Sequence, residues 1–151
     1  MNRWLVALCF VVSACAPPHS YESDCFKFDS LVELRQDRVD IYVATAKSIF
    51  DSKFGEGSLC ESAKGTHILV RDDDWWICNG SVECVGYTGP FSQLELSRWG
   101  NAFLHEMIHV YEARHFVLGT IDHKDWDELG YNEMHIEFLK VISRNELWWN
   151  E

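Results

Sequence analysis

The feature that most constrains this chain is a stretch at residues 99–117, which is apolar on nearly every side of a helix but contains two histidines and a glutamate. A helix that is apolar all round lies buried in a protein core. Polar side chains that are buried without partners each cost several kcal/mol of stability. His105, Glu106 and His109 therefore need partners inside the fold, and the rest of the chain has to supply or admit them.

These three residues form the pattern HExxH. On a helix, positions i and i+4 lie on one face about 6 Å apart, so the imidazoles of His105 and His109 can both reach one metal ion. Zinc lowers the pKa of a bound water towards neutrality, and Glu106 can accept its proton as a general base. The alternative is two core histidines with satisfied hydrogen bonds. We favour one Zn²⁺, because a metal ion supplies the partner that these buried side chains need.

With this motif the chain resembles the zincin metallopeptidases over residues 66–139, where a strand, an edge hairpin, the HExxH helix and a second helix are expected in that order. The resemblance implies that His105 and His109 are zinc ligands and that Glu106 is the catalytic base. It also implies that the edge strand holds extended substrate next to the metal. In this superfamily a third ligand lies downstream, and its identity divides the families.

Four residues compete for the third ligand position. His115 has the metzincin spacing HExxHxxGxxH, but Glu112 replaces the glycine that turns the chain back towards the metal. Asp122 ends a GTxD element similar to that of the aspzincins. His123 is a better zinc ligand by type and follows a helix-ending glycine, and Glu133 on the last helix resembles the gluzincin ligand. We rank His123 first, Asp122 second and Glu133 third.

The first 14 residues have the layout of a bacterial export signal, with Arg3 before an apolar stretch that is too short to span a bilayer. Residues 12–15 (VSAC) resemble a lipobox, which implies cleavage before Cys15 and lipid attachment to it. The alternative is an ordinary signal peptide cut near Ala16. Acyl chains on Cys15 imply a durable membrane anchor. The alanine after the cysteine implies a bacterial outer membrane, with the domain facing the periplasm.

Four further cysteines are available for pairing in an exported chain: Cys25, Cys60, Cys78 and Cys84. An even number implies two disulfides and allows three connectivities. Cys78 and Cys84 flank an Asn-Gly dipeptide, which is a strong hairpin-turn signal, so we expect a bridge across that hairpin. Cys25 and Cys60 then form the second bridge and tie the N-terminal segment to the body. A cysteine metal site is disfavoured, because no CxxC pair occurs.

Hydrophobic periodicity predicts an α+β fold with an N-terminal helix, a short mixed sheet with an edge hairpin, the HExxH helix and a C-terminal helix. The resemblance to the zincins implies that this fold is a small zincin-like domain. The N-terminal helix is expected to start with a capping box formed by Ser30 and Glu33. The expected helices are 30–51, 99–117 and 131–148, and the expected strands are 66–71, 75–78, 82–87 and, at an edge, 94–96. The expected divisions of the chain are a lipoprotein signal peptide (1–14), a lipidated tether (15–28) and a metallopeptidase domain (29–151).

The charge of the chain argues against one class of partner. Asp and Glu total 24 against 13 Lys and Arg, and the net charge of −11 argues against nucleic acid as a partner. The sequence predicts zinc-dependent hydrolysis of peptide bonds in the cell envelope, by a lipid-anchored protein that acts on a protein or peptide substrate. The alternative is an envelope lipoprotein without catalysis. In that case four protein ligands close a structural zinc site, or a retired peptidase fold serves for binding.

The lipobox makes a direct prediction. A Cys15→Ala variant should lose metabolic lipid labelling, because the acyl chains have no other attachment point in the motif. It should then accumulate as soluble periplasmic protein or as uncleaved precursor. Labelling that persisted unchanged would contradict the assignment of Cys15.

Overall fold

Helices and strands are interspersed along the chain in the computed structural model, which describes residues 17–78, 80–89, 93–115, 123–144 and 148–149. The strands are β1 (His19–Ser23), β2 (Phe26–Ser30), β3 (His67–Val70), β4 (Trp76–Cys78), β5 (Val82–Cys84), β6 (Gly86–Thr88) and β7 (Gln93–Leu96). The helices are α1 (Gln36–Phe54), α2 (Ser58–Ala63), α3 (Phe103–His115), α4 (Trp126–Leu129) and α5 (Tyr131–Ile142). The predicted α+β class is confirmed.

Five of the strands form one mixed sheet in the order β1-β2-β3-β7-β6. The three central strands are parallel, and β1 and β6 add antiparallel to the two edges. Phe28, Ile68 and Leu94 are register partners on the three central strands, and all three are buried. The residue before each of them is exposed. Because side chains alternate between the faces of a strand, one face of the sheet is covered and the other faces solvent.

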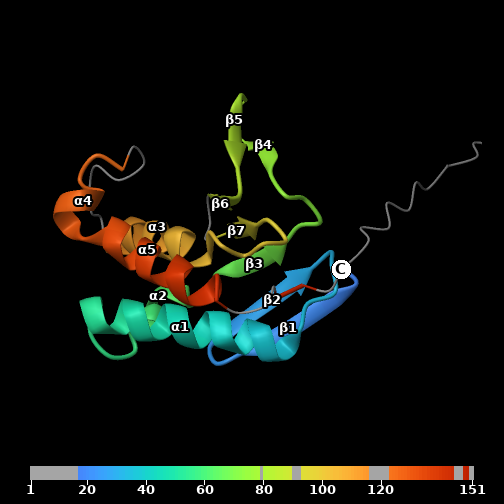
Figure 1. The fold of residues 1–151 in the computed structure, drawn as a ribbon, viewed down its shortest axis with the longest axis horizontal. Coiled ribbons are helices and arrows are strands. Elements are labelled where there is room, and N and C mark those ends of the chain that lie inside the picture. Colours follow the sequence, from blue (N-terminus) through green and yellow to red (C-terminus); the bar gives the residue numbers. More distant parts are fainter. Residues whose placement is uncertain (1–16, 79, 90–92, 116–122, 145–147, 150–151) are drawn as a thin grey trace, which may run out of the picture.

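Helices α1, α3 and α5 pack against one another beside the sheet (Figure 1). Aromatic rings connect the layers. The ring of Phe28 on β2 lies 5.7 Å from that of Phe103 on α3 and 5.9 Å from that of Trp148, between ring centroids. Trp148 stacks on Tyr42 of α1 at 4.9 Å. The HExxH helix is therefore held inside the core, as its apolar sequence requires.

The N-terminal part of the fold differs from the prediction in two ways. The expected tether at 15–28 is wrong for residues 19–28, because β1 and β2 pair antiparallel as part of the main sheet and bury Phe28. The expected capping box is also wrong. Ser30 ends β2, where its hydroxyl donates to the carbonyl of Val32 at 2.7 Å, and α1 begins only at Gln36.

The predicted edge of the sheet also needs correction. The single strand expected at 82–87 breaks at Val85, whose carbonyl accepts a hydrogen bond from the amide of Ser97 at 2.9 Å. Before the break, β5 pairs with β4 in a separate two-stranded sheet that projects from the body (Figure 1). After it, β6 pairs with the outer side of β7. The strand expected at the edge is therefore internal, and β6 is the edge strand beside α3.

The C-terminal helix is shorter than expected. It ends at Ile142 rather than at 148, and Trp148 is buried outside the helix. The adjacent Trp149 forms an isolated antiparallel bridge with Leu34. Trp148 and Trp149 thus add to the core from outside α5.

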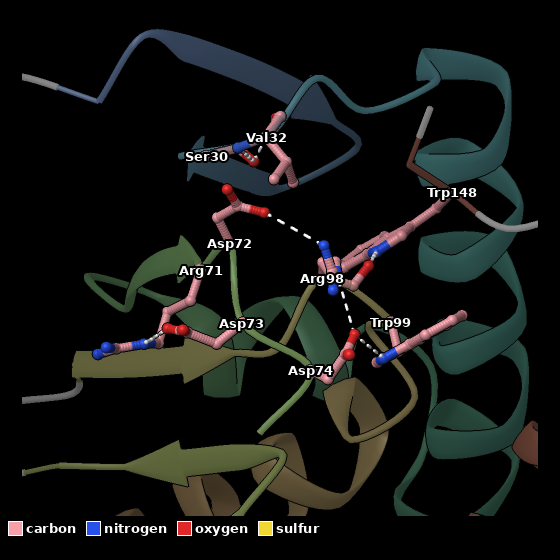
Figure 2. Close-up of polar contacts among 9 residues, drawn as sticks. All are labelled: Ser30, Val32, Arg71, Asp72, Asp73, Asp74, Arg98, Trp99 and Trp148. Carbon is pink, nitrogen blue, oxygen red and sulfur yellow. Dashed lines mark hydrogen bonds and ion pairs between the residues drawn. The ribbon is translucent and has the colours of Figure 1, made fainter. Parts of the chain in front are cut away.

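Two arginines fix the turn that leads from the sheet into the projecting hairpin (Figure 2). Arg98 donates to Asp74 at 2.7 Å, and the indole of Trp99 donates to the same carboxylate at 2.7 Å. Arg71 donates to Asp73 at 2.9 Å and its guanidinium lies 4.9 Å from the centre of the Trp76 ring. These contacts hold the base of the hairpin against the strands and the loop that precede α3.

Both predicted disulfides are confirmed. Cys25, in the turn between β1 and β2, is bonded to Cys60 in α2, and Cys78 is bonded to Cys84 across the projecting hairpin. The predicted signal peptide and Cys15 lie outside the described residues. Within the described part of the chain, no helix combines the length and the hydropathy needed to cross a bilayer.

The two bridges should differ in their effect on stability. The Cys25–Cys60 bridge spans 35 positions of sequence and the Cys78–Cys84 bridge spans 6. By loop-closure entropy, replacing the first pair by alanine should lower the free energy of unfolding by about 4 kcal/mol, and replacing the second by about 2 kcal/mol. Urea denaturation of the two double variants measures this difference. A larger loss from the hairpin pair would contradict the expected order.

Candidate metal centre

Three imidazoles converge at the side of α3. His105 and His109 lie one turn apart on this helix, and His123 approaches them from the segment just before α4. The Nε2 atom of His123 lies 3.0 Å from Nε2 of His109 and 3.2 Å from Nε2 of His105. One ligand atom from each of the three residues lies within 4.8 Å of the other two, so the group could hold a metal ion.

The backbone of His123 is unusual. Its φ of 58° places it in the left-handed region, which costs a non-glycine residue about 1–3 kcal/mol and persists only where the surrounding structure imposes it. The next element holds it in place, because the amide of Trp126 donates to the carbonyl of His123 at 3.2 Å. Such outliers cluster at functional sites. At this position the conformation brings an exposed histidine to the two histidines of α3.

Trp126 forms the wall of the site. Its side chain is fully buried, and its ring centroid lies 4.6 Å from that of His105, 4.9 Å from that of His109 and 4.4 Å from that of His123. One rigid indole therefore touches all three imidazoles and restricts their rotation. Its burial also excludes water from that side of the group.

The two helical histidines are neutral at physiological pH. Burial, with a smaller contribution from the neighbouring histidines, lowers the pKa of His105 to about 3. Burial and the nearby His123 lower the pKa of His109 to about 4. A neutral imidazole has a free lone pair, which is the form that binds a metal ion. Protons therefore compete weakly for these two nitrogens near pH 7.

A buried carboxylate orients His109. Glu112 lies one turn further along α3, is 1% exposed, and accepts a hydrogen bond from Nδ1 of His109 at 3.3 Å. A proton on Nδ1 leaves Nε2 as the lone-pair nitrogen, and Nε2 is the atom that faces His123. Carboxylates commonly fix metal-binding histidines in this way.

Glu106 is held on the side of α3 that faces the edge strand. It is 5% exposed, and its Oε2 atom accepts a hydrogen bond from the hydroxyl of Thr88 on β6 at 2.7 Å. Burial raises the pKa of Glu106 to about 7, although the hydrogen bonds from Thr88 oppose this rise. The carboxyl group can thus accept and release a proton near neutral pH.

The other candidates for a third ligand are placed differently. His115 is exposed, stacks on Tyr111 and donates from Nδ1 to the carbonyl of Tyr111 at 2.9 Å. Glu133 is exposed in the first turn of α5. Among the described residues, neither joins a group of three metal-binding side chains. Asp122 lies outside the described residues.

Several residues of the site do not emerge from the sequence. Glu112 could have been found, because residues three apart on a helix are neighbours and His109 precedes it by three. Trp126 and Thr88 have no such signal, since their roles depend on tertiary packing. His135 on α5 is a fourth histidine near the group; it is half-buried, and its ring centroid lies 5.3 Å from that of His105.

Comparison of the chain with protein-family models, with curated proteins and with solved structures finds no match in any of the three. The chemistry of the site is therefore inferred from its own residues.

The convergence of the three imidazoles predicts one metal-binding site per chain. In titration calorimetry with ZnCl₂, His123→Ala should weaken binding by more than about 100-fold, since even loss of an orienting outer group costs 10–100-fold. His105→Ala and His109→Ala should do the same. His115→Ala is the matched control and should bind like the wild type. Equal effects at His115 and His123 would contradict the site.

Proposed function

We propose that this chain is a zinc-dependent peptidase with His105, His109 and His123 as metal ligands and Glu106 as general base. The observation that carries the proposal is the convergence of three imidazole nitrogens, two of them from α3, the helix that also carries the buried carboxyl group of Glu106. Three imidazole nitrogens are a ligand set that suits zinc. Glu106 follows the ligand His105 directly in the sequence, and burial raises its pKa to about 7, which favours a catalytic role over a purely structural one.

The spacing of the nitrogens supports zinc. Zn–N bonds of 2.0–2.1 Å in a tetrahedral centre separate two ligand nitrogens by about 3.3–3.4 Å. The two separations in the structure are 3.0 and 3.2 Å. Catalytic zinc sites use three protein ligands and keep one position for water or substrate, whereas structural sites use four. A group of three histidines corresponds to the catalytic kind.

The division of roles follows from the environment of each group. Zinc, when bound, supplies Lewis acidity and lowers the pKa of a bound water. Glu106 takes a proton from the attacking water at its carboxylate and delivers it to the leaving amine, and a pKa near the working pH suits both steps. Glu112 keeps His109 in the tautomer that presents Nε2.

The free edge of β6 supports a peptide as substrate. Residues 85 and 89 are hydrogen-bonded to β7 through Ser97 and Gln93. In an antiparallel pair these bonded positions alternate, so the backbone groups of Gly86 and Thr88 point away from β7. Because β6 is an edge strand, the backbone groups of Gly86 and the C=O of Thr88 can bind an extended peptide as an added strand.

The cell envelope is the proposed location. A lipid attached to Cys15 would anchor the protein to the outer membrane. Two disulfides in a small domain favour an oxidising compartment such as the periplasm. Lipid attachment would place the site next to envelope proteins and peptides, which are the proposed substrates.

The test separates the base from the ligands. Glu106→Gln removes the proton acceptor at nearly constant size, so zinc content should remain one per chain while the cleavage rate of a fluorogenic peptide library falls by about 100-fold or more. Glu133→Gln makes the same change at an exposed position of α5 and serves as the control. Cleavage by the Glu106→Gln variant at the wild-type rate would contradict the proposed role.

A further inference from the structure

The edge strand β6 approaches α3 more closely than a side chain would allow. A Cβ atom added at Gly86 would lie 2.6 Å from Oε1 of Glu106 and 2.6 Å from Cβ of Ala102. Both distances are shorter than real Cβ contacts. The Glu106 carboxyl group occupies the space that a side chain would fill. Glycine is therefore needed at this position to leave room for that group.

Two residues further along the strand, the side chain of Thr88 forms a direct hydrogen bond with the same carboxyl group. Its hydroxyl donates to Oε2 of Glu106 at 2.7 Å and lies 3.2 Å from the backbone carbonyl oxygen of the same residue. A β-branched side chain on a strand has few rotamers, which favours a fixed direction for this hydroxyl. Gly86 therefore leaves room at one carboxyl oxygen of Glu106 and Thr88 binds the other.

Residues two apart on a strand face the same side of the sheet. Gly86 and Thr88 thus act on Glu106 from one face of β6, while the backbone groups of Gly86 and the carbonyl of Thr88 point away from β7, to the edge of the strand. A peptide paired with that edge would take its register from the two residues that also hold the carboxyl group. The reacting bond and the base would then be aligned by one short strand.

We propose that Gly86 and Thr88 are positioning residues for Glu106, and this inference rests on the proposed peptidase function. Thr88 fixes the direction of the carboxyl group, and Gly86 provides the space in which it lies. Neither residue is a metal ligand, so the proposal concerns the base and not the zinc.

Thr88→Val removes the hydroxyl and keeps the shape of the side chain. A misplaced catalytic group costs up to about 100-fold in rate, so kcat of the Thr88→Val variant should fall by about 10- to 100-fold, with KM changed by less than about 3-fold and zinc content still one per chain. Thr88→Ser, which restores the donor, should recover most of the lost kcat. Thr66→Val is the matched control, because the Thr66 hydroxyl has no hydrogen-bond partner among the described residues. A kcat for Thr88→Val equal to that of the control would overturn the proposal.

A second readout needs no catalysis. In metal-free protein labelled with ¹³C-glutamate, the Glu106 carboxyl resonance is identified by its loss in Glu106→Gln. It should shift in Thr88→Val and in Gly86→Ala, and stay in place in Thr66→Val. An unmoved resonance would overturn the proposal even if the peptidase function failed. If Thr88→Val did not fold, Thr88→Ala, which only creates space, would replace it in both readouts.

The two failures are distinguishable. Wild-type kcat in Thr88→Val together with an inactive Glu106→Gln variant would overturn the positioning role and leave the peptidase function intact. Wild-type activity in Glu106→Gln would overturn the function itself.

Discussion

The cost of burying His105, Glu106 and His109 on one helix determines what the rest of the structure has to provide. Glu106 is buried and the two histidines are half-buried on a helix that packs into the core, and each of the three meets a polar partner from another part of the chain or from its own helix. His123 faces both histidines, and Thr88 binds the glutamate. The same contacts bring three imidazole nitrogens together, and the helix that supplies two of them also carries the buried carboxyl group.

Two parts of the fold cover the HExxH helix on different sides. The sheet places β6 against one side of α3, where Glu106 lies. The segment leading into α4 covers another side with Trp126, which contacts the three imidazoles. The Cys25–Cys60 bridge ties the first hairpin to α2. Burial on both sides explains why the pKa values of the two helical histidines are low and that of Glu106 is high.

Features with a local cause could be predicted from the sequence. The i, i+4 spacing on an apolar helix identifies His105 and His109, and the Asn-Gly turn identifies the hairpin disulfide. Features with a tertiary cause could not. Strands β1 and β2 follow two prolines and lack a long apolar run. The local sequence therefore does not indicate that they are strands of the main sheet. The convergence of His123 depends on a left-handed backbone and on the wall formed by Trp126, neither of which follows a periodic pattern.

The central claim is a metal centre with three histidine ligands and one position left for chemistry. X-ray absorption at the zinc edge of the zinc-loaded protein tests it most directly, because it counts and types the atoms bound to the metal. The account predicts three imidazole nitrogens at about 2.0–2.1 Å and one further oxygen from water. A fourth imidazole, a carboxylate that completes the shell, or a sulfur ligand would show a closed structural site and contradict the proposed enzyme.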